Sequence, residues 1–221
     1  MLDYQIIPPR RPSRPAGERS WCLILHGLGD SMDGWKPVAP LLGIDELGYV
    51  VVNAPDAYHG GFSWFDLARD FSPDVSQIRR SRGLLEELIA HLLAELGIPA
   101  EQLFLMGFSQ GSLMILDVAL RSTHQFAGLV GISGFMALLE EFPAAFSPAG
   151  RSQHLMLSHG LFDGMIPIAF ARQQRDRLRA LGIALDWREY PKEHSLDRVR
   201  EIPDIRAFIL AHGAASAPAP R

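Results

Sequence analysis

Short apolar runs alternate along this chain with longer segments in which apolar residues recur at helical spacing. Several of the short runs are apolar without alternation, which is typical of parallel strands that are covered on both faces. The predicted strands are Trp21–Leu25, Tyr49–Asn53, Leu103–Met106, Gly128–Ile132, Leu155–Ser158 and Leu185–Tyr190.

The clearest helical pattern runs from Ser76 to Leu96, and Gly97 with Pro99 ends it. Further helices are predicted at Gln110–Arg121, Ile168–Leu181 and Leu196–Ala211. This alternation of strands and helices predicts an α/β fold, a doubly wound and mostly parallel sheet with helices on both faces. In such sheets the active site lies beyond the carboxyl ends of the strands.

The two ends of the chain differ in composition from its middle. Residues 8–19 are rich in Pro and Arg, so residues 1–20 are predicted to hold an N-terminal strand and an exposed connector whose basic cluster is a solvated loop rather than a docking patch. The small residues and prolines of 213–221 are typical of a flexible tail. Because no repeat or composition shift divides residues 21–212, we expect them to form one domain without a large lid.

Length, charge and cysteine content limit the classes of function. A chain of 221 residues fits one domain, and a net charge of −4 gives no reason to expect nucleic acid or an anionic membrane as partner. The single cysteine, Cys22, lies in an apolar run, so we expect it to be buried without a disulfide. No apolar run reaches the roughly 18 residues that span a bilayer, and the N-terminus lacks a signal-peptide pattern. We therefore expect a cytoplasmic protein, and the oligomeric state stays open, a dimer included.

One motif suggests nucleophilic chemistry. Gly107-Phe108-Ser109-Gln110-Gly111 matches G-x-S-x-G and lies between a predicted strand and a predicted helix, which is the setting of a nucleophile elbow. The glycines allow a strained backbone at the serine and close packing around it. The alternative is an ordinary Gly/Ser turn, and because serine is a poor nucleophile without a base, the partners decide.

Histidines that follow Ser109 are the candidates for the general base. His194 comes after the last predicted strand, in a loop before the final helix, which makes it the favoured base. His159 ends another strand and is the weaker rival, being more often a packed or backbone-bonded residue. His124 and His212 lie at helix ends, where we expect them on the surface.

The acid and the oxyanion hole are expected in strand-end loops as well. Asp163 lies in such a loop between Ser109 and His194, and would orient the imidazole and stabilise its charged form; the alternative is a turn or N-cap carboxylate. The amide of Gln110 is one expected oxyanion donor, and the amide of Leu28, ahead of its neighbour Gly27, is the other.

Two polar residues beside Leu28 have other expected roles. His26 precedes the serine in the chain and is expected to brace the loop rather than act as base. Asp30 is expected to bond backbone amides within the same loop.

Together these motifs resemble the phospholipase/carboxylesterase family of α/β-hydrolases, which includes acyl-protein thioesterases and small bacterial carboxylesterases. The matching residues are Leu25–Asp30, Ser63–Asp66, Gly107–Gly111, His159-Gly160 with Asp163 and Pro167, and Tyr190 with His194. The resemblance implies an α/β-hydrolase fold and a serine esterase with a Ser109–His194–Asp163 triad, without metal or organic cofactor. It also implies carboxylic esters, thioesters or lysophospholipids as substrates. The family usually carries a glycine shortly before this histidine, whereas this chain reads Tyr190-Pro191-Lys192-Glu193-His194.

An aromatic loop and two rival functions complete the expectations. Phe62, Trp64 and Phe65 are predicted to line an acyl-binding groove, and the alternative for each is a core anchor. The leading hypothesis is an ester hydrolase with an acyl-enzyme intermediate and a small-molecule or lipid acyl ester as substrate. The alternatives are a hydrolase-fold binding protein without catalysis and a peptidase that uses the same triad.

Overall fold

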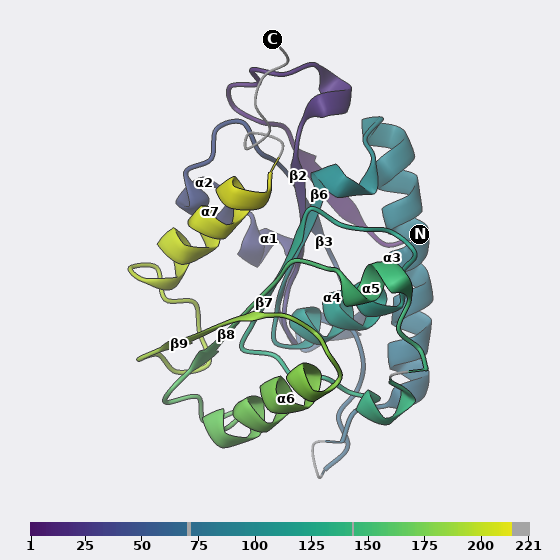
Figure 1. Ribbon diagram of the computed structural model, residues 1–221, viewed down its shortest axis with the longest axis vertical. Helices are drawn as coiled ribbons and strands as arrows, with labels where there is room; N and C mark the ends of the chain where they lie inside the picture. The colour runs from purple at the N-terminus through teal and green to yellow at the C-terminus, as the bar shows by residue number, and fades with distance from the viewer. Residues whose placement is uncertain (70–71, 143, 214–221) are drawn as a thin grey trace.

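A seven-stranded sheet forms the centre of the computed structural model, which describes residues 1–69, 72–142 and 144–213 (Figure 1). The strand order is β1-β3-β2-β6-β7-β8-β9, and every neighbouring pair is parallel except β1 with β3. The strands are β1 Tyr4–Ile7, β2 Trp21–Leu25, β3 Gly48–Val52, β6 Leu103–Phe108, β7 Gly128–Ile132, β8 Leu155–Gly160 and β9 Asp186–Tyr190. The predicted α/β class, with a mostly parallel sheet, is confirmed.

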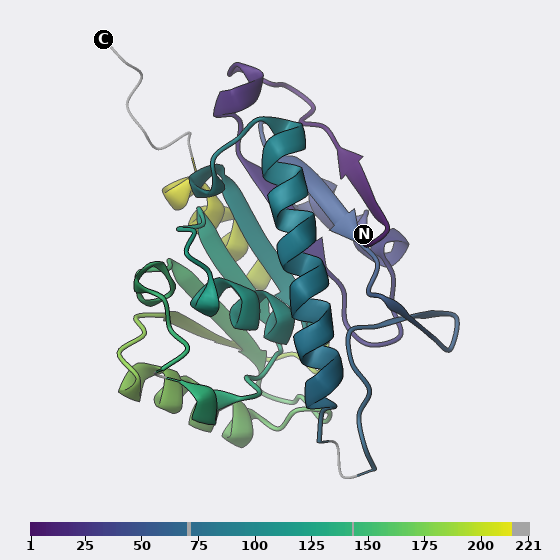
Figure 2. The same cartoon turned by 90° about the vertical axis from the view of Figure 1, so that its right-hand side faces the viewer.

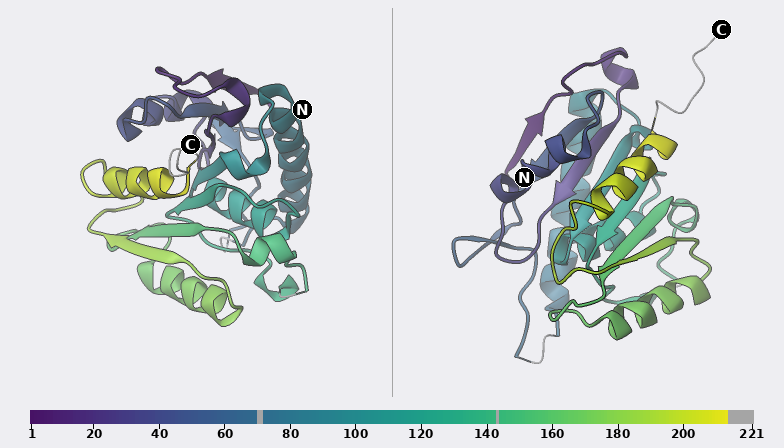
Figure 3. Two further views of the ribbon diagram at one scale, coloured as in Figure 1. Left: turned by 45° about the horizontal axis from the view of Figure 1, so that its top comes forward. Right: turned by 90° about the vertical axis from the view of Figure 1, so that its left-hand side faces the viewer.

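Helices cover both faces of this sheet (Figures 1 and 3). One face packs against α1 Met32–Trp35, α2 Val38–Leu42 and α7 Glu201–His212. The other packs against α3 Val75–Leu96, α4 Gln110–Arg121 and α6 Ile168–Ala180, and α5 Pro148–Arg151 lies beside α4. The long α3 runs across its face of the sheet, as Figure 2 shows.

Alternate residues of each central strand enter two separate cores. In β2, Leu23 and Leu25 pack towards α3 and α4, whereas Cys22 and Ile24 pack towards α1, α2 and α7. All five residues of β2 are buried, which explains why this strand is apolar without alternation. The expectation for Cys22 is confirmed, because the side chain is fully buried and unpaired.

The start of the last helix differs from the prediction of Leu196. α7 begins at Glu201 because the side chain of Asp197 accepts hydrogen bonds from the amides of Val199 (2.9 Å) and Arg200 (3.0 Å). These bonds fold residues 197–200 into a turn, as aspartate often does before a helix. The stretch from His194 to Arg200 is therefore a loop, and this loop carries the predicted general base.

Several elements have no counterpart in the sequence prediction. They are α1, α2, α5, three short 3₁₀ turns and the hairpin of β4 Asp56–Tyr58 with β5 Gly61–Ser63. The Pro/Arg-rich residues 8–19 lie outside the sheet and contain one of these turns, Ala16–Glu18. The predicted tail falls, from residue 214 on, outside the described residues. Among the described residues, no helix is long and apolar enough to cross a membrane.

Candidate active site

The loops that carry the expected site residues all leave the sheet at the edge where the parallel strands end. Leu28 follows β2, Ser109 follows β6, Asp163 follows β8 and His194 follows β9. A cavity of about 770 Å³ opens at this edge, and Leu28, Ser109, Gln110 and His194 all line it. The fold therefore brings together residues that are up to 166 positions apart in the chain (194 − 28).

Ser109 has a strained backbone. Its φ of 52° and ψ of −114° lie where residues with a side chain are rare. Neighbouring glycines permit this turn, since a Cβ on Gly107 would lie 2.3 Å from the carbonyl oxygen of Gly111. A Cβ on Gly111 would lie 2.4 Å from the carbonyl oxygen of Leu25. The turn between β6 and α4 thus presents the serine at the cavity, as a nucleophile elbow does.

Two residues that line the cavity with Ser109 have backbone amides that are free to bind an oxyanion. Within the described parts of the chain, the N–H groups of Leu28 and Gln110 make no hydrogen bond, whereas Gly29 N donates to the carbonyl oxygen of Phe62 (2.9 Å). Gln110 opens α4, where the first N–H groups have no partner in the helix and the helix dipole favours negative charge. The cavity therefore has two donors of the kind that the sequence predicted.

Asp163 and His194 are directly bonded. His194 Nδ1 donates to Oδ2 of Asp163 at 2.7 Å, which leaves Nε2 as the free nitrogen of the ring. The other oxygen of Asp163 accepts from the amides of Met165 (2.9 Å) and Ile166 (2.8 Å), so the carboxylate also closes its own turn. The ring of Phe108, which precedes the serine, packs against the His194 ring with centroids 4.9 Å apart. Ser109 and His194 line one cavity, and the bond to Asp163 orients the imidazole there.

The rival histidine, His159, is completely buried and makes a structural bond. Its Nε2 donates to the carbonyl oxygen of Ile166 at 2.8 Å and lies 3.4 Å from Asp163 Oδ2. Burial lowers the pKa of His159, which favours the neutral ring. His159 therefore braces the Asp163 loop and does not reach the cavity.

His26 and Asp30 brace the loop after β2, as expected. His26 is buried, its Nδ1 donates to the carbonyl oxygen of Gly27 (2.6 Å), and its Nε2 accepts from the amide of Ala54 (3.0 Å). Asp30 accepts from the amide of Ser31 (2.7 Å) and from Trp35 Nε1 (3.0 Å). These bonds fix the backbone that carries Leu28.

The predicted acyl-pocket aromatics lie elsewhere. Trp64 and Phe65 are completely buried in the core, and Phe62 packs against that core without lining the cavity. The side chain of Gln110 accepts from the amide of Trp64 (3.0 Å) and donates to the carbonyl oxygen of Phe65 (2.7 Å). Trp64 Nε1 donates to the carbonyl oxygen of His26 (3.0 Å). These aromatics are core anchors that tie the serine turn to the Leu28 loop.

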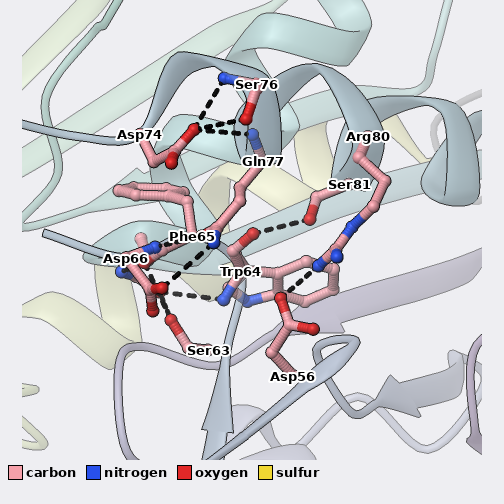
Figure 4. Close-up of polar contacts among 11 residues, drawn as sticks. Asp56, Ser63, Trp64, Phe65, Asp66, Asp74, Ser76, Gln77, Arg80 and Ser81 are labelled. Carbon is pink, nitrogen blue, oxygen red and sulfur yellow. Dashed lines mark hydrogen bonds and ion pairs between the residues drawn. The ribbon is translucent and has the colours of Figure 1, made fainter.

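The same segment is also tied to the start of α3 (Figure 4). Ser81 Oγ donates to the carbonyl oxygen of Trp64 at 2.6 Å, and Gln77 exchanges two hydrogen bonds with Asp66, at 2.5 and 3.0 Å. Asp74 caps the helix by accepting from the amides of Ser76 (2.8 Å) and Gln77 (3.1 Å). The first turn of α3 is thereby held at the edge of the cavity, where Val75 forms part of the lining.

Apolar side chains that the sequence analysis did not single out form most of the cavity wall. They come from the segment after β7, from the loop after β8 and from α6: Phe135, Met136, Ala137, Leu138, Leu139, Met165, Ile166 and Phe170. The run Phe135–Leu139 is separated from the end of β7 by two residues and lies at the same edge as the other site loops, and this position was a usable signal in the sequence. Polar or charged lining also exists, at Glu140, Gln174 and Arg177.

No group of three or more His, Cys, Asp or Glu residues that could hold a metal ion occurs in residues 1–69, 72–142 and 144–213. The candidate site thus consists of a serine, a histidine–aspartate pair, two free amides and an apolar cavity. This set has the parts that acyl transfer through a serine needs.

Comparisons with known proteins agree with this chemistry. A family model described as Phospholipase/Carboxylesterase matches residues 6–213. Acyl-protein thioesterase 1 of Debaryomyces hansenii is 28% identical, over 93% of this chain and 97% of that one. Acyl-protein thioesterase 1 of Schizosaccharomyces pombe is 34% identical, over 66% of this chain and 69% of that one. The crystal structure of esterase PE8 shares the fold, with a TM-score of 0.85 at 21% identity, covering 96% of this chain and 99% of that one. The chain belongs to the phospholipase/carboxylesterase family of α/β-hydrolases.

Proposed function

We propose that this protein is a serine hydrolase of carboxylic esters and thioesters, in which Ser109 is the nucleophile, His194 the general base and Asp163 the residue that orients the base. The observation that carries the proposal is the strained Ser109 in the same cavity as His194, whose other nitrogen is bonded to Asp163 at 2.7 Å. Family membership and the acyl-protein thioesterase relatives support the reaction class.

The first half of the reaction forms an acyl-enzyme. His194 Nε2 takes the proton of Ser109 Oγ while that oxygen bonds to the substrate carbonyl carbon. The carbonyl electron pair moves to its oxygen, which the amides of Leu28 and Gln110 stabilise with two hydrogen bonds. When the tetrahedral intermediate collapses, the bond to the leaving alcohol or thiol breaks and His194 returns its proton to that group. Asp163 stabilises the imidazolium in between.

The second half releases the acid. Water takes the place of the leaving group, gives its proton to His194 and attacks the acyl carbon, and the same two amides hold the oxyanion again. Collapse then breaks the ester bond to Ser109, and His194 returns the proton to the serine. No step calls for a metal or an organic cofactor.

The cavity wall supports acyl groups as the bound part of the substrate. Buried or half-buried apolar side chains line it after β7, and Phe170 lines it from α6. Such a surface gains free energy from covering an alkyl chain, at about 25 cal/mol for each Å². We therefore propose a small-molecule or lipid acyl ester, lysophospholipids included, as substrate, and the cytoplasm stays the predicted location.

Replacing Ser109 by alanine tests the proposal. We expect S109A to fold and to lose nearly all hydrolysis of a chromogenic short-chain ester and an acyl thioester, because the other groups cannot form the acyl-enzyme. A fluorophosphonate probe should label the wild type and the control S122A, which changes a serine at the far end of α4, but not S109A. Wild-type turnover by S109A would refute the assignment. Failure of the probe to label the folded wild type would favour a binding protein of the same fold.

A further inference from the structure

A buried ion pair joins the loop that carries His194 to the start of α7. Lys192 Nζ lies 2.7 Å from each carboxylate oxygen of Glu201, at the start of α7. The side chain of Lys192 is 4% exposed and that of Glu201 is fully buried. Charged groups are rarely buried at this depth, since desolvation costs several kcal/mol for each ion. A pair retained in such a place calls for an explanation beyond stability.

The main chain around Lys192 joins the two loops of the candidate triad. The carbonyl oxygen of Lys192 accepts from the amide of Phe162, the residue before Asp163, at 3.1 Å. A Cβ on Gly160 would lie 2.4 Å from that same oxygen, so the loops after β8 and β9 pass each other in close contact. Lys192 is thus anchored on one side to the Asp163 loop through its backbone and on the other to α7 through its side chain.

The carboxylate of Glu201 also holds the far end of the His194 loop. Its Oε2 accepts from the amide of Asp197 at 3.0 Å. Lys192 and Asp197 flank His194 on the two sides, so both ends of this short loop are fixed to one buried carboxylate. The loop contains no glycine, and these bonds fix both of its ends.

The charged and titratable groups around the pair belong to the same site. Lys192 interacts electrostatically with Asp163 and Asp197 as well as with Glu201, and burial lowers the pKa of its ammonium group. The neighbouring His159 interacts with Lys192, Asp163 and His194. The hydroxyl of Tyr190 donates to Asp204 at 2.7 Å and also interacts electrostatically with Glu201. Lys192 therefore interacts with Asp163, the carboxylate that holds His194, and a change in the charge of the pair changes the field at that carboxylate.

We propose that Lys192 and Glu201 are positioning residues for catalysis: their buried pair fixes the His194 loop against the Asp163 loop, and their opposite charges balance at the imidazole. This inference rests on the proposed function of His194 as base. Neither residue lines the cavity or touches the reacting atoms.

Two single substitutions with opposite effects on charge test the electrostatic part. Lys192→Met leaves a buried anion, which favours the protonated base, so the acidic limb of the pH profile of kcat/KM should move up by about half a unit. Glu201→Gln leaves the cation, so the same limb should move down. In both variants kcat should be calculated per active site, with the number of active sites counted by fluorophosphonate labelling. This kcat should fall about tenfold to a hundredfold because the base is displaced. KM for a short ester should change little because the cavity is intact.

A double variant and a control separate positioning from stability. Lys192→Met with Glu201→Leu removes both charges, which often leaves stability unchanged or raised, so this variant should fold even where a single variant does not. Its kcat for each labelled site should stay at least about tenfold below the wild type, with the acidic limb near the wild-type position. Arg172→Met breaks the exposed pair with Glu189, formed by bonds of 2.9 and 2.7 Å, and should change neither quantity.

Wild-type kcat in the double variant would overturn the inference, as would limb shifts of the same sign in the two single variants. Either result leaves the proposed function intact, since the wild type still hydrolyses the ester. Absence of turnover and labelling in the wild type would overturn the proposed function and the inference together.

Discussion

Gly111 lies where α4 begins beside the end of β2, in close contact with the loop that carries Leu28, the proposed second oxyanion donor. A Cβ at this position would lie 2.4 Å from the carbonyl oxygen of Leu25 and 2.7 Å from that of His26. Both contacts are with backbone atoms at the carboxyl end of β2 and just after it, which cannot rotate away as the end of a side chain can. The substitution Gly111→Ala must therefore push α4 away from β2.

Two opposed effects set the expected change in stability. Alanine is favoured over glycine in a helix by up to about 1 kcal/mol. Overpacking of a tight contact costs about 1–3 kcal/mol, and the upper part of that range applies here because the neighbours are backbone. We expect a net loss of about 1–2 kcal/mol in the free energy of unfolding. Since α4 carries the Gln110 amide, we also expect kcat to fall by about a hundredfold, the usual loss when one oxyanion donor is displaced.

Urea denaturation and ester hydrolysis by the same preparations measure both effects. The matched control is Gly83→Ala in α3, where nothing lies within 4 Å of the added Cβ. This control should gain about 0.5–1 kcal/mol from helix propensity and keep the wild-type kcat. If Gly111→Ala matched Gly83→Ala in stability and in kcat, the close approach of α4 to β2 would have no part in building the site.

Three further substitutions test other parts of the site. Asp163→Asn should lower kcat by about 10⁴-fold, because the amide cannot hold His194 with the proton on Nδ1. An assay with titrated active sites measures this loss. A loss below about tenfold would refute the role of Asp163. Ala137→Trp should fill part of the cavity and lower kcat/KM for long-chain esters by tenfold or more, while kcat/KM for acetate esters should stay nearly unchanged. An equal loss for all chain lengths would argue against Ala137 as part of an acyl site. Burial lowers the pKa of His26 below the value of about 6.5 in the unfolded chain, so stability should fall as pH drops below about 6.5. Urea denaturation midpoints at about pH 7.5 and 5.5 should show this loss of stability. The difference between the two midpoints should be smaller in His26→Gln, and it should be unchanged when the exposed His59 is replaced.

The three predicted triad residues, which the fold brings together, all lie at ends of parallel strands. Ser109, Asp163 and His194 each follow an apolar run, and the carboxyl ends of parallel strands meet at one edge whatever the order of the strands in the sheet. Local sequence thus sufficed to place them together. The order of the main strands and long helices was also predictable from local sequence. Their apolar runs and helical periods are long enough to indicate the type of each element.

Contacts between distant segments decided what the sequence missed. Trp64 and Phe65 are core residues because the side chain of Gln110 and the first turns of α3 close over them, and nothing in their own segment specifies that. α7 begins at Glu201 and not at the predicted Leu196 because Asp197 accepts hydrogen bonds from the residues that follow it. The short α1 and α2 have too few residues to show a period.

The strain at Ser109 is sustained by contacts on three sides. A serine with φ of 52° costs about 1–3 kcal/mol and persists only where its surroundings leave no alternative. The glycine contacts hold the turn against its own helix and against β2, and the buried side chain of Gln110 holds it against Trp64 and Phe65. The amide of Ser109 donates to the carbonyl oxygen of Ile132 at 2.9 Å, which fixes it to β7. Gln110 therefore has two parts in the proposed mechanism: its amide is the proposed oxyanion donor, and its side chain fixes the turn. For this reason Gln110→Ala should lower kcat although the amide itself remains, whereas a change confined to the cavity wall should alter chain-length preference alone.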